Sequence, residues 1–191
     1  TVAAFVMLLL VGFAARERIQ SRRIAEERDR ANRETQTAEQ VSEFLVGLFQ
    51  VSDPGKALGN TITAREILDA GSEKVESDLA GQPEVQARMM ATISHVYFNL
   101  GLFPQAESLL ERALQVRKDH AGEDDADTLT LMGDLAVVLK RQSRLEEAER
   151  LYRTALDRQR RTLGDEDPKT LNTLNNLALL LHDQGKVDEA E

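Results

Sequence analysis

A period of 42 residues in the C-terminal half of the sequence constrains the fold more than any other feature. The dipeptide Ala-Glu recurs at residues 106–107, 148–149 and 190–191. Turn positions recur in the same register at Gly101, Ser143 and Gly185. Self-similarity at such a period is typical of repeat architectures, in which each unit buries its apolar surface against the next.

Each unit contains two amphipathic runs joined by this turn, so the repeat is predicted to be a helix–turn–helix. The second run begins near Pro104, Glu146 or Asp188. Only 4 Pro and 11 Gly occur, and aromatic residues make up 4% of the chain, whereas Ala, Leu, Glu and Arg are abundant. This composition favours helices with an aliphatic core. The sequence therefore predicts an all-α solenoid.

Two segments carry a family resemblance. Residues 145–168 (LEEAERLYRTALDRQRRTLGDEDP) and residues 175–178 (NNLA) resemble a tetratricopeptide repeat, in the 42-residue form found in kinesin light chains and many bacterial proteins. The resemblance covers residues 84–191, about two and a half repeats, and implies a right-handed solenoid. The first repeat departs from the pattern at Ser94 and at Phe103-Pro104. The third stops at Glu191, at the start of its second helix, so we expect the natural chain to continue.

The first forty residues form two further segments. Residues 1–15 carry no charged side chain and are predicted to be a truncated transmembrane helix, with a buried soluble helix as the alternative. This implies a single-pass membrane protein, and the sequence leaves the membrane side of the repeats open. Residues 16–40 are dense in Arg and Glu and are predicted to be a charged juxtamembrane helical stalk, with a disordered linker as the alternative.

Residues 41–83 are predicted to be a helical adapter, or N-terminal cap, before the repeats. An apolar stripe at helical spacing runs from Val41 to Phe49, and a turn follows at residues 52–55. Thr63-x-x-Glu66 is a candidate capping box for a second helix. Phe44, Leu48 and Phe49 could also pair two chains, which would give self-association.

The order of these segments carries a second resemblance. An apolar span, an Arg/Glu stalk and the stretches EQVSEFLVGLFQVSDP and TITAREILDAG resemble the region that follows the kinase domain in bacterial, eukaryotic-like serine/threonine protein kinases. The kinase motifs themselves (a G-x-G-x-x-G loop, H-R-D and D-F-G) do not occur in this sequence.

Residues that could carry catalysis or hold a metal or cofactor are not found at the spacing such chemistry needs. The chain has no Cys, and His95, His120 and His182 form no pair at metal-ligand spacing. The acidic run at residues 123–127 lacks the pattern of a calcium loop and is interpreted as a solvated inter-repeat loop that places acids near the next helix N-terminus. With 24 basic and 33 acidic residues, a net charge of −9, the chain is not expected to bind nucleic acid.

The family resemblance implies that the first helix of each repeat lines a concave groove. Matching positions are mostly polar or basic and predict a groove for an extended, partly acidic peptide; ordinary solvated residues are the alternative. The second repeat lacks the family's groove Asn, since Gly133 and Asp134 match Asn175 and Asn176. The candidate groove residues are Arg88, His95, Phe98, Asn99, Thr130, Val137, Lys140, Arg141, Asn172, Asn175 and His182.

Two functions remain open at this point, and both are non-catalytic for these residues. The first is a protein–protein interaction scaffold or sensor region of a membrane-anchored bacterial serine/threonine protein kinase. The second is a stand-alone membrane-anchored repeat adaptor without a kinase. Both predict a protein or peptide partner, and neither requires a cofactor.

Overall fold

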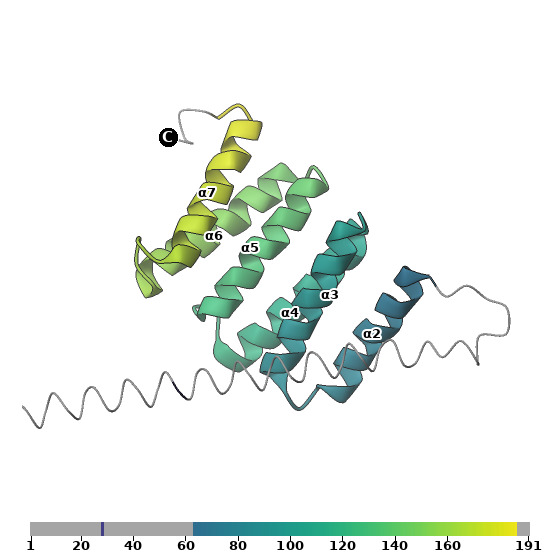
Figure 1. The fold of residues 1–191 in the computed structure, drawn as a ribbon. Helices are drawn as coiled ribbons and strands as arrows, with labels where there is room; N and C mark the ends of the chain where they lie inside the picture. Colours follow the sequence, from purple (N-terminus) through teal and green to yellow (C-terminus); the bar gives the residue numbers. More distant parts are fainter. Residues whose placement is uncertain (1–27, 29–62, 187–191) are drawn as a thin grey trace, which may run out of the picture. The chain divides into compact units, whose positions relative to one another are not determined.

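The computed structural model describes residue 28 and residues 63–186, and the latter range contains six α-helices and no strand (Figure 1). Arg28 is helical. The predicted membrane segment, most of the predicted stalk and the predicted helix at residues 41–49 lie outside the described residues. No helix among the described residues combines the length and apolarity that a membrane span requires.

The six helices follow one another as stacked pairs, in the order of the sequence (Figure 1). Within a repeat, α3 packs on α4 and α5 packs on α6; between repeats, α4 packs on α5 and α6 on α7. This arrangement confirms the predicted all-α helix–turn–helix solenoid. The helices span Ala64–Asp78 (α2), Pro83–Asn99 (α3), Phe103–Ala121 (α4), Ala126–Arg141 (α5), Leu145–Thr162 (α6) and Pro168–Asp183 (α7).

Side-chain caps set the start of three helices. Thr63 and Glu66 form the predicted capping box at the start of α2. Asp125 accepts hydrogen bonds from the backbone N–H groups of Asp127 and Thr128 at the start of α5. Asp167 accepts one from Lys169 at the start of α7. Each oxygen satisfies donors that the first turn of a helix leaves without an intrahelical partner.

The turn inside each repeat has the same geometry three times. Gly101, Ser143 and Gly185 adopt φ values of 74°, 63° and 75°. The residue after each donates its N–H to a carbonyl five positions earlier, at 2.8, 3.0 and 2.9 Å. Such a 6→1 bond closes a helix C-terminus through a left-handed residue. The period seen in the sequence is therefore also a period in backbone conformation.

Small side chains allow the two helices of a repeat to pack closely. Ser94, Ala106, Ala136 and Ala148 are fully buried. The Ser94 hydroxyl donates to the carbonyl of Ala106 at 2.9 Å, so a serine is accommodated where the repeat pattern has alanine.

Helix α2 extends the same stack. Gln86 of α3 donates to the carbonyl oxygens of Val75 and Glu76 at 3.4 and 3.1 Å. The buried Tyr97 donates its hydroxyl to Asp69 at 2.6 Å, and burial together with this bond raises the pKa of Tyr97 to about 12. Ala64 of α2 also lies 42 residues before Ala106, so α2 is in register with the second helices of the repeats.

Candidate functional site

The first helices of the three repeats, α3, α5 and α7, line two clefts. One cleft, of about 340 Å³, lies between α3 and α5, with Lys169 of α7 at its edge. Arg88 and Thr130 line it, beside the small or apolar side chains of Ala91 and Leu131. The second cleft, of about 450 Å³, lies between α5 and α7. Val137, Lys140 and Arg141 line it.

Five of the predicted groove residues thus line the clefts, and two more contact residues that do. His95 Nε2 lies 3.6 Å from Asp134 Oδ2, and this contact raises the pKa of His95. The ring of Phe98 lies under the guanidinium of Arg141, and it also packs edge-on against Phe103, with ring centroids 5.5 Å apart. The other four predicted residues, which are all exposed, line neither cleft: Asn99, Asn172, Asn175 and His182.

The guanidinium of Arg141 lies over the ring of Phe98, with its carbon 5.5 Å from the ring centroid. This cation–π contact joins α5 to α3 across the groove. It leaves the edge of the guanidinium, with its N–H donors, open to a ligand, because a ring face contacts the guanidinium plane and not its donors. Arg141 is exposed, so an incoming carboxylate can reach it.

Lys140 is already paired. Its Nζ lies 2.7 Å from Asp183 Oδ2 in α7, and the hydrogen bond from Lys140 lowers the pKa of Asp183. Lys140 lines the second cleft as a predicted groove residue, but a ligand carboxylate would have to compete with Asp183 for it. The repeat register carried a signal that was missed, since Asp183 lies 42 residues after Arg141 and so returns to the same end of the groove.

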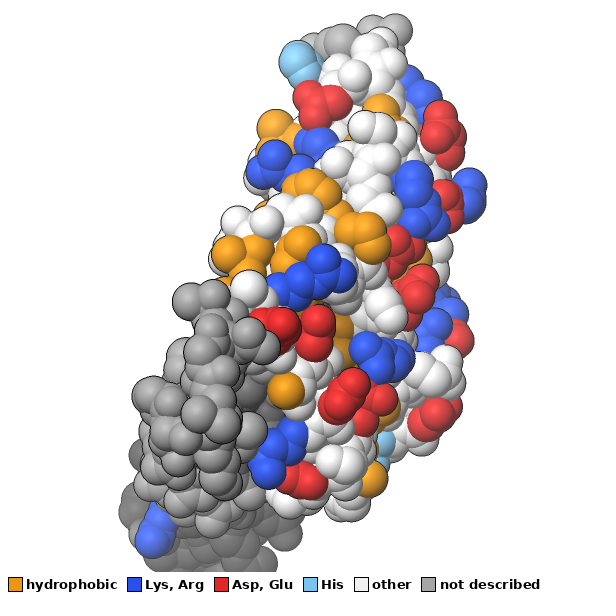
Figure 2. Space-filling model, turned by 90° about the vertical axis from the view of Figure 1, so that its right-hand side faces the viewer, with side chains coloured by type: hydrophobic (Ala, Val, Ile, Leu, Met, Phe, Trp, Pro, Cys, Tyr) orange, Lys and Arg blue, Asp and Glu red, His pale blue; other side chains and the backbone are white. Residues whose placement is uncertain are grey.

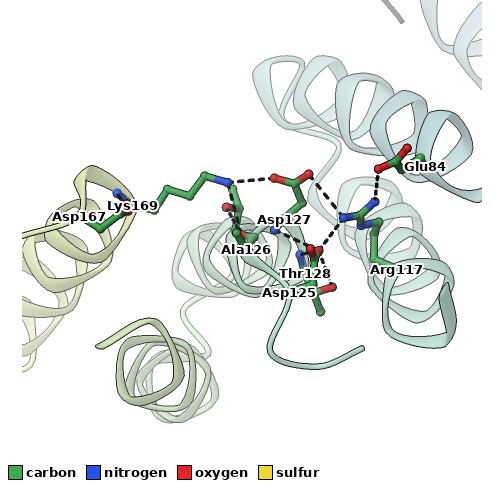
Figure 3. Close-up of polar contacts among 9 residues, drawn as sticks. Glu84, Arg117, Asp125, Ala126, Asp127, Thr128, Asp167 and Lys169 are labelled. Atoms are coloured by element: carbon green, nitrogen blue, oxygen red, sulfur yellow. Dashed lines mark hydrogen bonds and ion pairs between the residues drawn. The ribbon is translucent and has the colours of Figure 1, made fainter. Parts of the chain in front are cut away.

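A buried arginine that sequence reasoning did not identify also lines the first cleft, and Figure 3 shows its polar contacts. Arg117 of α4 is only 5% exposed. Its Nη2 lies 2.6 Å from Asp125 Oδ1 and 3.5 Å from Asp127 Oδ2, and its Nη1 lies 3.4 Å from Glu84 Oε1. Lys169 Nζ reaches Asp127 Oδ1 at 2.9 Å and so connects α7 to this cluster.

The acidic run at residues 123–127 places acids at the start of α5, as the sequence predicts, but not every one of them is solvated. Glu123 and Asp124 are exposed and pair with Arg158, at 2.6 and 3.0 Å. Asp125 is half-buried, caps α5 and bonds Arg117. A buried cation next to a helix N-cap needs this carboxylate, because an unpaired buried charge is strongly destabilising.

Charges of both signs are interspersed over the face of the described residues that Figure 2 shows, with no extended patch of one sign. Nor do three or more His, Asp or Glu side chains anywhere in the described part of the chain come together as a metal site would require. The groove is thus a surface of mixed charge in which a few cations and apolar side chains are accessible.

Comparison with solved structures shows the fold. A crystal structure of BtubC (BKLC) from P. vanneervenii has a TM-score of 0.58 and 23% identity, and the match covers 66% of this chain and 50% of that one. The chain thus spans half the length of BtubC. A putative kinesin light chain from P. anserina, with nearly identical TPR-like repeats, has a TM-score of 0.53 and 20% identity, over 83% of this chain and 85% of that one. No curated protein matches the chain.

A family model agrees with the repeat register. The model described as "Tetratricopeptide repeat" matches residues 85–161 and again residues 127–191. Together these matches span residues 85–191, which is 107 of the 191 residues. The chain therefore belongs to the tetratricopeptide repeat family.

Proposed function

We propose that the repeats are a non-catalytic interaction module that holds an extended segment of a partner protein in the groove of α3, α5 and α7. Tetratricopeptide repeats generally mediate protein–protein interaction. The observation that carries the proposal is the pair of clefts on these helices, lined by Arg88, Thr130 and Arg141 together with Val137. Charged donors beside small and apolar side chains suit a peptide ligand.

A blocking substitution tests this proposal. Thr130 lines the first cleft, so Thr130→Trp fills space that a peptide would occupy. Thr154 is the matched control, because it lies exposed on α6 and its hydroxyl makes the same bond to a carbonyl four residues earlier, at 2.8 Å in both cases.

The probe is a library of random peptides displayed on phage and selected on the wild-type chain. Selected peptides should lose binding to the Thr130→Trp variant and keep it with Thr154→Trp. Peptides that bind both variants as well as the wild type would place the binding surface elsewhere and overturn the proposal.

For the whole protein, we propose a scaffold or sensor region of a membrane-anchored serine/threonine protein kinase. The support is the uncharged segment at residues 1–15, the Arg/Glu-rich stalk at residues 16–40 and the resemblance of residues 39–71 to the region after such kinase domains. The gene sequence upstream of Thr1 tests this directly. Kinase motifs there would support the proposal, and their absence would favour a stand-alone membrane-anchored adaptor.

A further inference from the structure

We propose that the ligand of this groove is an extended peptide with two acidic side chains about six residues apart, one bound by Arg88 and the other by Arg141. This inference rests on the proposed function and names the chemistry that the groove selects. It follows from which cations are free, where they lie and how far apart the repeat geometry places them.

Almost every cation of the repeats is already neutralised. Between residues 63 and 186, each Lys and Arg has a carboxylate oxygen within 4.0 Å except Arg88, Arg141 and Arg150. Arg88 and Arg141 line the two clefts, whereas Arg150 lies exposed on α6. A new carboxylate can therefore pair with Arg88 or Arg141 without displacing an existing partner.

The paired cations of the groove are less available to a ligand carboxylate than Arg88 and Arg141. Lys140 would have to leave Asp183, and Lys169 would have to leave Asp127. Arg117 contacts three carboxylates and is almost fully buried. A densely anionic ligand such as a nucleic acid would also meet Glu84, Asp127 and Asp134 on the cleft walls, so two separate negative charges fit the groove better than a continuous run.

The two arginines differ in how they are held. Arg141 is positioned by its stacking on Phe98, so it loses little side-chain freedom when it binds a carboxylate. Arg88 has no ion pair and stands beside Ala87 and Ala91 in the first cleft. Between the arginines, the half-buried Val137 of α5 lines the second cleft and can contact the apolar atoms of a peptide.

The repeat geometry gives the spacing between the two charges. Arg88 is in register with Thr130, and Arg141 lies 11 residues further along α5. This corresponds to ~16 Å along a helix axis, and the step from the first helix of one repeat to that of the next adds about 10 Å across, a distance of the order of one interhelix spacing. The resulting separation of roughly 19 Å equals about six residues of extended chain at ~3.3 Å each. The length of the arginine side chains broadens this optimum by about one residue.

The probes are fluorescein-labelled synthetic peptides of Ser, Thr and Val that carry two Glu residues separated by two, four, six or eight positions. Their affinity for the full chain is measured by fluorescence polarisation at low and at raised salt. We expect the tightest binding at a separation of six, with affinity falling as salt screens the contacts. Arg88→Gln and Arg141→Gln should each weaken this peptide by about fivefold.

Two controls make these losses specific. Arg150→Gln removes the third unpaired arginine, on α6, and should leave the affinity unchanged. Replacing one Glu of the peptide by Gln already breaks its ion pair with one of the two arginines. Substitution of that arginine should then cause no further loss of affinity.

The outcomes separate this inference from the proposed function. If the peptides bind and Thr130→Trp blocks them, but affinity depends neither on Glu spacing nor on Arg88 and Arg141, the groove binds peptides and the two-arginine inference is wrong. If Thr130→Trp does not weaken peptide binding, the groove is not the binding site, and the proposed function is wrong as well. If no member of the series binds while phage-selected peptides do, the inference alone is overturned.

Discussion

At the residue scale, Arg117 and Gln159 occupy the same position of successive repeats but have different surroundings. Arg117 bonds Asp125, and the Thr128 hydroxyl donates to the same Asp125 oxygen at 3.2 Å. Gln159 and Thr170 stand 42 residues after Arg117 and Thr128, and both are only 1% exposed. Gln159 Oε1 and Thr170 Oγ1 have no hydrogen-bond partner among the described residues. In the first junction Arg117 and Thr128 thus both bond Asp125, although Arg117 Nε has no partner among the described residues, whereas in the second junction the Gln159 and Thr170 oxygens bond nothing there.

This difference predicts opposite results for the same substitution. Thr128→Val should lower the free energy of unfolding by about 1 kcal/mol, because it removes a hydrogen bond to a carboxylate. Thr170→Val should leave that free energy unchanged or raise it, because it removes a buried hydroxyl that has no protein partner. Urea denaturation of both variants measures the two values. Equal destabilisation by the two substitutions would contradict this view of the junctions.

Asp125 should make the first junction sensitive to acid. Burial raises the pKa of this carboxyl, but the hydrogen bonds and charge of Arg117, with the Thr128 N–H, outweigh burial and lower it below the usual aspartate range. Because the pKa is lower in the folded chain than in the unfolded chain, unfolding takes up a proton in acid. The stabilisation by Asp125 is therefore complete above the ordinary aspartate pKa and is lost as the pH falls through the lowered value.

The comparison of wild type with Asp125→Asn tests this prediction. Asn can still cap α5, but it does not titrate. Thermal unfolding measured from neutral pH down to about pH 3 should show a smaller acid-induced loss of Tm in the variant. An identical loss in both proteins would show that Asp125 does not contribute to the acid sensitivity.

The residue scale is also where sequence reasoning was weakest. It found Arg88, Thr130, Val137 and Arg141 because the repeat register places them on the first helices. It missed Arg117 because a lone Arg on an amphipathic helix resembles any solvated charge. Burial and pairing depend on side chains brought together from α3, α4 and α5, and neither is visible in local spacing.

At the scale of elements, the turn at Ser143 is strained where its equivalents are not. Ser143 adopts a φ of 63°, a value that glycine takes at the matching positions 101 and 185. A left-handed conformation costs an ordinary L-residue about 1 kcal/mol or more. Glycine at position 143 would relieve this strain. The gain is partly offset, because glycine makes the unfolded chain more flexible and so raises the entropy lost on folding.

Ser143→Gly should therefore stabilise the chain by about 0.5 kcal/mol. The reverse change, Gly101→Ser, should destabilise it by a similar amount. Urea midpoints of the two variants against the wild type give both numbers. A destabilising Ser143→Gly would mean that the serine side chain contributes more than its backbone strain costs.

The elements themselves could be predicted from the sequence almost completely. Helices α3 to α7 followed from the 42-residue period and the small residues, and the start of α2 followed from the capping box. Each of these signals depends on residues close together in the sequence. The membership of α2 in the repeat register was missed. Ala64 matches Ala106, but Gly71 and Ser72 replace larger or more typical helix residues and weaken the similarity.

At the scale of the described repeats, α7 is less well covered than its counterpart α5. Leu171 and Leu174 of α7 are 50% and 40% exposed, whereas the matching Leu129 and Met132 of α5 are buried. Helix α5 packs on α6 of its own repeat and on α4 of the preceding one, whereas among the described residues α7 packs on α6 and only slightly on α5. Stability in a solenoid is approximately a sum over neighbour contacts, so α7 has the weaker support.

Hydrogen exchange should reveal this gradient. Backbone amides in the middle of α7 should exchange faster than those of α5 in the same chain, because α7 opens locally at a lower free energy. Mass spectrometry of peptic fragments from α5 and α7 measures both rates. Equal protection in the two helices would indicate that other residues cover the α7 leucines in solution.

Peptide binding in the groove of α3, α5 and α7 is tested by mapping where a bound peptide lies. The peptide with two Glu residues six positions apart is titrated into isotopically labelled protein, and backbone amide shifts are followed by NMR. Binding in the groove should give shifts concentrated on α3 and α5 around Arg88, Thr130 and Arg141, with α4 and α6 little changed. Shifts concentrated on the outer faces of α4 and α6 would contradict it.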